Sequence, residues 1–111
     1  MKITVITVAF NSEKTIKDTL LSVIEQDYPN IEHIVIDGGS SDKTAEIVKA
    51  HSGRIAYFVS EPDKGIYDAM NKGIDLASGD VIGFLNSDDV YTHSGVVTQI
   101  ASALNLSLIH I

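Results

Sequence analysis

Two adjacent carboxylates end an apolar stretch, in the segment Asn86-Ser87-Asp88-Asp89. Neighbouring carboxylates in one turn repel each other unless a cation or hydrogen-bond donors compensate. Hard divalent ions such as Mg²⁺ and Mn²⁺ prefer oxygen ligands, and one or two carboxylates plus substrate phosphates often hold them. Asn, Ser and Asp also favour turns and helix caps, so a plain turn is the alternative interpretation. We predict a metal site at Asp88 and Asp89, because other acidic turns are expected beside them.

Three further polar segments follow apolar stretches in the same way. Phe10-Asn11 follows the first stretch, Asp37-Gly38-Gly39 the second and Asp63 the third. In an open parallel sheet, ligands bind beyond the carboxyl ends of the strands, where loop amides and helix N-termini converge. A carboxylate such as Asp37 can accept hydrogen bonds from a ribose hydroxyl or a base N–H, and an Asx-turn before the glycines is its alternative role. We therefore expect these side chains to meet at one edge of a sheet.

Strand-like and helix-like segments alternate from the first residues to about residue 90. Strands rich in β-branched residues are expected at 3–10, 31–36, 55–59 and 81–85. Helices capped near Ser12 and near Ser41 or Asp42, and a third over residues 66–77, lie between them. This order predicts the α/β class, with a Rossmann-like parallel sheet of about four strands and flanking helices. So few strands leave uncovered edges, as expected of a truncated part of a larger domain.

Composition and charge restrict the partners. A chain of 111 residues holds one small domain, and its net charge of −7 argues against nucleic acid. No apolar stretch approaches the roughly 20 residues that span a bilayer, and the absence of cysteine suits the cytoplasm. An anionic phosphate ligand would need a cation between itself and the carboxylates, which the expected divalent ion supplies. Scattered carboxylates that only keep the protein soluble are the alternative.

The end of the chain matches no expected element. Residues 106–111, Leu-Ser-Leu-Ile-His-Ile, equal the translation of a common transposon-derived sequencing adaptor. We therefore expect a native part over residues 1–105 and a non-native tail over 106–111. A short apolar strand at the C-terminus is the alternative.

Four segments, in order and at the expected spacing, resemble the N-terminal, nucleotide-sugar-binding part of glycosyltransferase family 2, whose catalytic domains have the GT-A fold. The resemblance covers residues 2–104. One segment looks like the subgroup that acts in capsule, exopolysaccharide and colanic-acid-type synthesis, namely Glu-Pro-Asp-Lys-Gly-Ile-Tyr-Asp-Ala-Met-Asn-Lys-Gly at 61–73. The other three are Thr-Val-Ala-Phe-Asn at 7–11, Ile-Asp-Gly-Gly-Ser-Ser-Asp-Lys-Thr at 36–44 and Leu-Asn-Ser-Asp-Asp at 85–89.

The resemblance implies residue roles. The residues expected at the nucleotide are Ala9, Asn11, Asp37, Asp63 and Asp88. Of these, Asp37 would bond the base and Asp63 would approach the nucleobase end. Asn86 replaces the first Asp of the family's Asp-x-Asp motif, which leaves more to the residues that follow. Asp88 would contact ribose or metal, and Asp89 would hold Mg²⁺ or Mn²⁺ against the diphosphate.

The implied reaction is an inverting, metal-dependent transfer from a nucleotide-diphosphate sugar, with a UDP-sugar favoured, to a glycan or lipid-linked acceptor in cell-envelope polysaccharide synthesis. A general base deprotonates the acceptor hydroxyl, and the metal stabilises the departing nucleoside diphosphate. The family's base is a carboxylate beyond residue 111, so we name no catalytic residue and expect this chain to bind nucleotide without transferring sugar. Family members often work at the inner membrane face, which is compatible with peripheral membrane association of a longer protein.

Two other classes of protein use an acidic, metal-binding α/β sheet. A sugar-nucleotide nucleotidyltransferase would need a Gly-rich basic loop after the first strand, where this chain has Asn11-Ser12-Glu13. A non-enzymatic, Mg²⁺-binding receiver-like domain would need a phosphorylatable Asp at mid-sheet and a Lys closing the last strand, and neither is evident. Both classes are weaker interpretations than the transferase.

Overall fold

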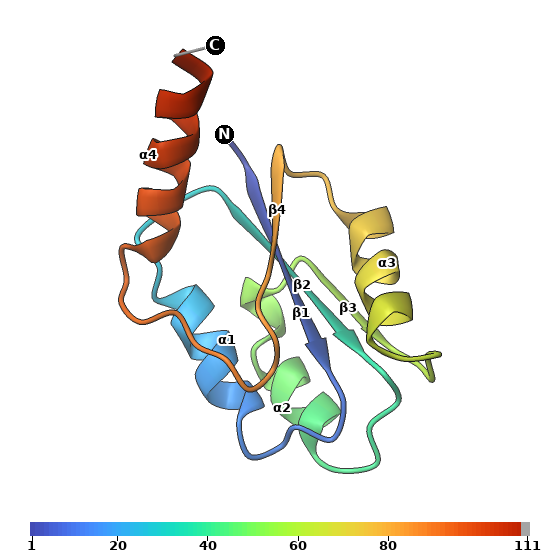
Figure 1. The fold of residues 1–111 in the computed structure, drawn as a ribbon. Coiled ribbons are helices and arrows are strands. Elements are labelled where there is room, and N and C mark those ends of the chain that lie inside the picture. Colours follow the sequence, from blue (N-terminus) through green and yellow to red (C-terminus); the bar gives the residue numbers. More distant parts are fainter. Residues whose placement is uncertain (110–111) are drawn as a thin grey trace.

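The computed structural model describes residues 1–109 of the chain. Its centre is a four-stranded sheet in the order β3-β2-β1-β4, and all neighbouring strands pair in parallel. In Figure 1 the arrowheads of β1 and β2 point to the same lower edge. The strands are β1 (Ile3–Ala9), β2 (Ile31–Asp37), β3 (Tyr57–Ser60) and β4 (Val81–Phe84). The predicted Rossmann-like parallel α/β fold is confirmed.

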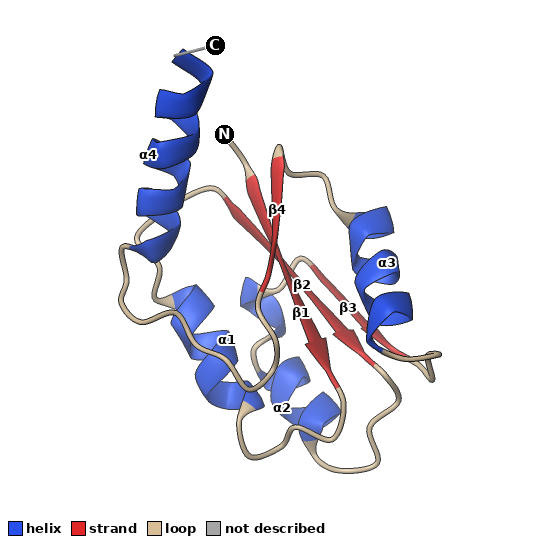
Figure 2. Ribbon diagram, in the orientation of Figure 1, coloured by secondary structure: helices blue, strands red, loops and turns tan. Residues whose placement is uncertain are grey.

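Helices cover both faces of this sheet (Figure 2). The helices are α1 (Ile16–Ile24), α2 (Thr44–Ala50), α3 (Ile66–Leu76) and α4 (Val96–Ile109), with a 3₁₀ turn at Ser52–Arg54. Leu20 of α1 and Val48 of α2 share a buried cluster with Val35. Ala69 of α3 packs on Ile6, on the opposite face. None of the helices within the described residues is long and apolar enough to cross a bilayer.

The strand register aligns the ends of the strands. Ala9 lies opposite Asp37, and Asp37 lies opposite Ser60. Ile6 lies opposite Phe84, the last residue of β4. Because the strands run in parallel and end almost level, the segments that follow them leave the sheet along one edge.

Two expectations about the limits of the helices and strands are wrong. The third strand begins at Tyr57 rather than at residue 55, because a 3₁₀ turn ends at Arg54 and Ile55 joins the cluster under α1 and α2. Residues 106–109 continue α4, so the expectation that they match no element is also wrong. Residues 110 and 111 lie outside the described residues, and the non-native origin of the tail stays a prediction.

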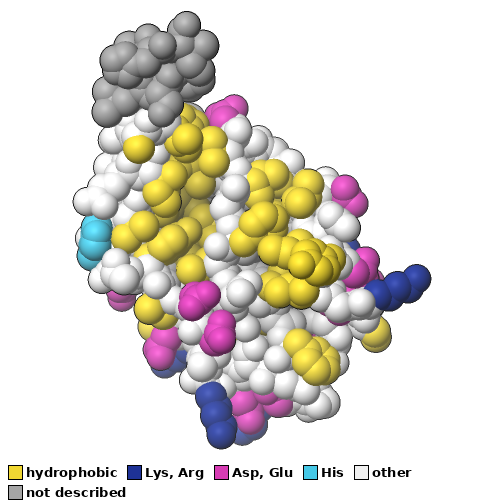
Figure 3. Space-filling view, viewed as in Figure 1, with side chains coloured by type: hydrophobic (Ala, Val, Ile, Leu, Met, Phe, Trp, Pro, Cys, Tyr) yellow, Lys and Arg dark blue, Asp and Glu magenta, His cyan; other side chains and the backbone are white. Residues whose placement is uncertain are grey.

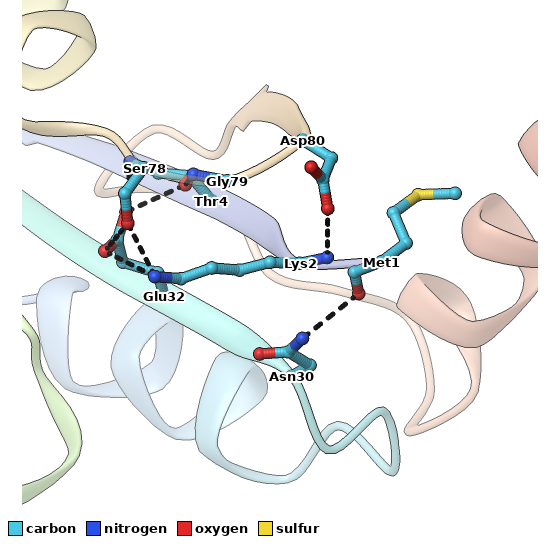
Figure 4. A network of polar contacts seen from close by, with 8 residues as sticks. All are labelled: Met1, Lys2, Thr4, Asn30, Glu32, Ser78, Gly79 and Asp80. Atoms are coloured by element: carbon cyan, nitrogen blue, oxygen red, sulfur yellow. Dashed lines mark hydrogen bonds and ion pairs between the residues drawn. The ribbon is translucent and has the colours of Figure 1, made fainter.

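A buried carboxylate ties the opposite edge of the sheet together (Figure 4). Glu32 of β2 accepts hydrogen bonds from the Thr4 hydroxyl at 2.9 Å and from the Ser78 N–H and hydroxyl at 2.8 and 2.7 Å. The Lys2 ammonium lies 3.2 Å away. Burial alone would raise the pKa of Glu32, but these donors outweigh it and lower the pKa to about 2. The ionised carboxylate therefore links β1, β2 and the loop before β4.

This carboxylate predicts a pH dependence of stability. Since its folded pKa lies below the unfolded value, Glu32 stabilises the fold above about pH 4.5, and that contribution is lost as pH falls towards 2. We expect Glu32→Gln to lower the free energy of unfolding by about 1–3 kcal/mol at neutral pH, measured by urea denaturation. The deficit should shrink as the pH falls below 4.5.

Glu46→Gln is the matched control, because Glu46 is exposed on α2. It should leave stability near the wild-type value across the pH range. A constant deficit for Glu32→Gln from neutral pH to about pH 3 would contradict the assigned ionisation.

Candidate functional site

An open cleft of about 910 Å³ lies at the carboxyl ends of the strands. It is formed by the end of β1, by the segments that follow β1, β2, β3 and β4, and by the start of α3, at the edge that the sequence predicted. Its lining combines apolar residues with the acidic residues Glu13, Asp42, Asp63 and Asp88, and Figure 3 shows acidic and apolar side chains close together on this side of the molecule. The residues used below that line it are Ala9, Phe10, Asn11, Lys14, Gly38, Asp63, Asn86 and Asp88.

Asn11 ties the loop after β1 to the loop after β2. Its main-chain N–H donates to the Ser40 hydroxyl at 2.8 Å, and its side-chain oxygen accepts from the Ser41 N–H at 2.9 Å. Asn11 has φ of 47°, a left-handed conformation that Asn adopts more readily than most residues. Its residue type thus suits both the turn and the link between the loops.

Asp37 lies beneath the cleft and does not line it. Its carboxylate is fully buried and accepts hydrogen bonds from the Ser40 N–H at 3.0 Å, the Ser60 hydroxyl at 2.7 Å and the Ser40 hydroxyl. This is the Asx-turn that was the alternative interpretation. Direct bonding of a base by Asp37 stays a prediction, and it would require these serines to release the carboxylate.

Asp63 reaches the cleft from the loop after β3. One carboxylate oxygen accepts the Gly65 N–H at 3.1 Å. The other sits over Gly38, where an added Cβ would lie only 2.8 Å from it. Gly38 does not adopt a left-handed backbone conformation. Glycine suits this position because a side chain here would collide with the Asp63 carboxylate.

Asp88 lines the cleft, whereas Asp89, also exposed, lies in the same turn without lining it. The turn is closed by the Asp89 N–H, which donates to the Asn86 carbonyl at 2.9 Å. In the part of the chain that the structure describes, no three Asp, Glu, His or Cys side chains gather as a metal site. The Asp37 carboxylate does not join the turn of Asp88 and Asp89 at the cleft, because Ser40 of its own turn and Ser60 of β3 occupy it.

Phe10 and Lys14 line the cleft but were not among the predicted nucleotide-binding or metal-binding residues. Phe10 is 62% exposed at the end of β1, although it is large and apolar. Lys14 lines the cleft and is its only cationic residue among those described. The sequence placed the segment of Phe10 at this edge, and a large apolar residue directly after a fully buried strand is the signal that could have identified it. Nothing in the local pattern distinguishes Lys14 from other surface lysines.

Comparison with known proteins identifies the family of the chain. The family model for glycosyl transferase family 2 matches residues 4–105. The chain therefore belongs to glycosyl transferase family 2. The resemblance inferred from the four motifs, and the GT-A fold that it implied, are confirmed.

One curated relative is the Escherichia coli UDP-Glc:alpha-D-GlcNAc-diphosphoundecaprenol beta-1,3-glucosyltransferase WfgD, 34% identical over 97% of this chain and 44% of WfgD. Among solved structures, S. aureus TarS 1–349 in complex with UDP-GlcNAc has a TM-score of 0.86 and 30% identity, over 95% of this chain and 31% of TarS. The mannosyltransferase PcManGT of Pyrobaculum calidifontis, in complex with GDP-Man and Mn²⁺, has a TM-score of 0.83 and 26% identity, over 90% and 31%. The chain spans less than half the length of the curated relatives that it matches.

The left-handed turn predicts an order of stability at position 11. Asn11→Ala should lower the free energy of unfolding by about 1–2 kcal/mol, because it loses the Ser41 bond and because alanine adopts positive φ less readily than asparagine. Asn11→Gly loses the same bond but keeps the conformation, so its loss should be smaller. Urea denaturation measures both, and equal losses would contradict the role of the backbone conformation.

Proposed function

We propose that this chain forms the nucleotide-sugar-binding part of an inverting, metal-dependent glycosyltransferase that uses a UDP-sugar. The observation that supports this most is one cleft at the carboxyl ends of parallel strands, whose lining includes an exposed aromatic ring and, from different loops, the carboxylates of Asp63 and Asp88. The name of WfgD includes UDP-Glc, and the TarS structure contains UDP-GlcNAc. These relatives favour uridine over guanosine for this cleft.

The base end of the nucleotide would lie between Phe10 and Asp63. An exposed aromatic face at the cleft can stack on a base, which explains why Phe10 is not buried. The Asp63 oxygen above Gly38 has no hydrogen-bond donor among the described residues and can accept an imide N–H of uracil. Ala9 and Asn11 would form the adjoining floor and wall of this end.

The diphosphate end would lie at Asp88 and Asp89. Neither side chain accepts a hydrogen bond from the described residues, so their oxygens are free to coordinate Mg²⁺ or Mn²⁺. This donor set fits a hard divalent ion completed by phosphate oxygens, and PcManGT is described with Mn²⁺. When bound, such an ion stabilises negative charge on the departing nucleoside diphosphate. Lys14, at the same cleft, would add one cationic contact.

The transfer itself is proposed for the longer protein. Inversion needs a base at the acceptor hydroxyl, and we assign that base to a residue beyond 111. The diphosphoundecaprenol in the name of WfgD favours a lipid-linked or glycan acceptor in cell-envelope polysaccharide synthesis, with peripheral association at a membrane. The nucleotidyltransferase and receiver-like alternatives gain no support from the family match.

Isothermal titration with UDP tests the proposed nucleotide site. We expect UDP to bind more tightly with Mn²⁺ than without it. Asp88→Asn should weaken Mn²⁺-dependent binding about tenfold or more, since it removes an anionic metal ligand, a loss of about 1.4 kcal/mol per tenfold. No sugar transfer is expected from the 111-residue chain.

Asp75→Asn is the matched control, because Asp75 is exposed on α3 outside the cleft. It should bind UDP like the wild type. If the wild type binds UDP equally well with and without Mn²⁺, the metal role is wrong, and if it does not bind UDP at all, the proposed function fails.

Gly38 allows a separate test of the base end. Gly38→Ala places a Cβ against the Asp63 carboxylate, so the carboxylate must move away from the end of β2. We expect UMP affinity, measured by NMR titration, to fall by up to about tenfold. The stability of the fold should change little, because Gly38 does not have a positive φ. Gly53→Ala, where an added Cβ meets nothing within 4 Å, should bind like the wild type. Unchanged affinity in Gly38→Ala would show that Asp63 does not need this place.

A further inference from the structure

One face of α1 is polar where a core helix would be expected to be apolar. Thr19 and Ser22 project from it at helical spacing, Gln26 follows just beyond the last helical residue, Ile24, and Thr19 is fully buried. The neighbour on this face is the segment between β4 and α4, which contains no helix or strand. We call these three residues the α1 ladder.

Thr19 contacts the turn that presents Asp88. Its hydroxyl oxygen lies 2.9 Å from the Ser87 carbonyl and 2.6 Å from the Asp89 carbonyl. The hydroxyl has a single hydrogen, so these two carbonyls share it. Thr19 thus binds the backbone on both sides of Asp88 and leaves the Asp88 side chain free towards the cleft.

The other ladder residues continue the same contact along the segment. The Ser22 hydroxyl accepts the Tyr91 N–H at 3.2 Å. The Gln26 amide donates to the His93 carbonyl at 2.8 Å and accepts the Val97 N–H at 3.0 Å. The ladder therefore supplies hydrogen bonds that strand or helix pairing would otherwise provide.

The sheet also supports this turn. Pairing with β1 continues beyond β4, because the Leu85 N–H donates to the Ile6 carbonyl at 2.9 Å and the Ser87 N–H donates to the Val8 carbonyl at 3.2 Å, and the Ser87 and Ser12 hydroxyls lie 2.6 Å apart. β4 ends at Phe84, before the turn begins. Beyond Ser87, the turn is held by its own bond from Asp89 to Asn86 and by Thr19 of α1.

We infer that Thr19 is a positioning residue for nucleotide binding, which holds the Asp88–Asp89 turn at the distance where its carboxylates can share a divalent ion with a diphosphate. This inference rests on the proposed function. Thr19 does not line the cleft and would touch neither nucleotide nor metal. A rigid support for a short metal-binding turn matters because a small displacement of a carboxylate oxygen breaks coordination at 2.0–2.6 Å.

Thr19→Val tests this role, because valine keeps the shape and removes the hydroxyl. We expect the gain in UDP affinity that Mn²⁺ gives, measured by calorimetry, to fall about tenfold, while UMP affinity without metal stays within about twofold of wild type. Thr19→Ser keeps the hydroxyl and should restore the gain. Thr92→Val, at an exposed threonine of the same segment, should behave as wild type.

Several outcomes would overturn the inference. One is that Thr19→Val shows the same Mn²⁺-dependent gain in UDP affinity as the wild type. Another is that Thr19→Val loses UMP binding and UDP–Mn²⁺ binding equally, which would indicate a general packing role. If circular dichroism shows that Thr19→Val does not fold, Ser22→Ala is the deciding variant. We expect the Mn²⁺-dependent gain in UDP affinity to fall about threefold in Ser22→Ala, and an unchanged gain would overturn the inference. A wild type whose UDP binding does not depend on Mn²⁺ would overturn the metal role and this inference together. A normal wild-type gain that survives in Thr19→Val would overturn this inference alone.

Discussion

Parallel pairing of β1 with both of its neighbours is the constraint on which the rest of the structure depends. All residues of β1 from Ile3 to Ala9 are buried, and the strand pairs with β2 and β4 on either side. Parallel neighbours require every connection to cross back over the sheet, so each helix returns the chain to the same starting edge. The segments that leave the strands then share the other edge. A cleft made from four loops distant in sequence follows from this topology.

The two edges of the sheet use their polar groups differently. At the amino edge, the Glu32 carboxylate is satisfied by Thr4, Ser78 and Lys2, and its function is to hold strands together. At the carboxyl edge, Asp63 and Asp88 have oxygens without donors among the described residues. A hard divalent ion bound in the cleft would give such oxygens a partner. This contrast distinguishes structural from ligand-binding acids better than the residue type does.

The sequence predicted the sheet well because its strands alternate with helices and contain dense β-branched stretches. It also predicted which segments reach the cleft, since polar residues follow every strand. It did not separate Asp37 from Asp63. Both are acids after a strand, and only the positions of Ser40, Ser60 and Gly38 decide which carboxylate is occupied and which is free. Contacts between residues this far apart depend on the packed tertiary structure, which local patterns do not contain.

The polar face of α1 was missed for a related reason. Thr19 falls at a position where helical spacing indicates core, and its hydroxyl has a purpose only when the turn after β4 lies against it. The reverse error occurred at the C-terminus, where apolar residues without an expected partner continue a helix through 109. In both places, the partner of a segment determines its role.

The most direct measurement is an NMR map of backbone amides, recorded during titration with UDP and a small proportion of Mn²⁺. If the loops after the strands form one nucleotide site, Mn²⁺ should broaden the amides of residues 86–89 most, and UDP should shift those of residues 9–12, 38 and 63–65. The amino edge around Glu32 and Ser78 should stay unchanged. Broadening or shifts centred on that opposite edge, or on the smaller cavity beside His33 and Arg54, would contradict the account.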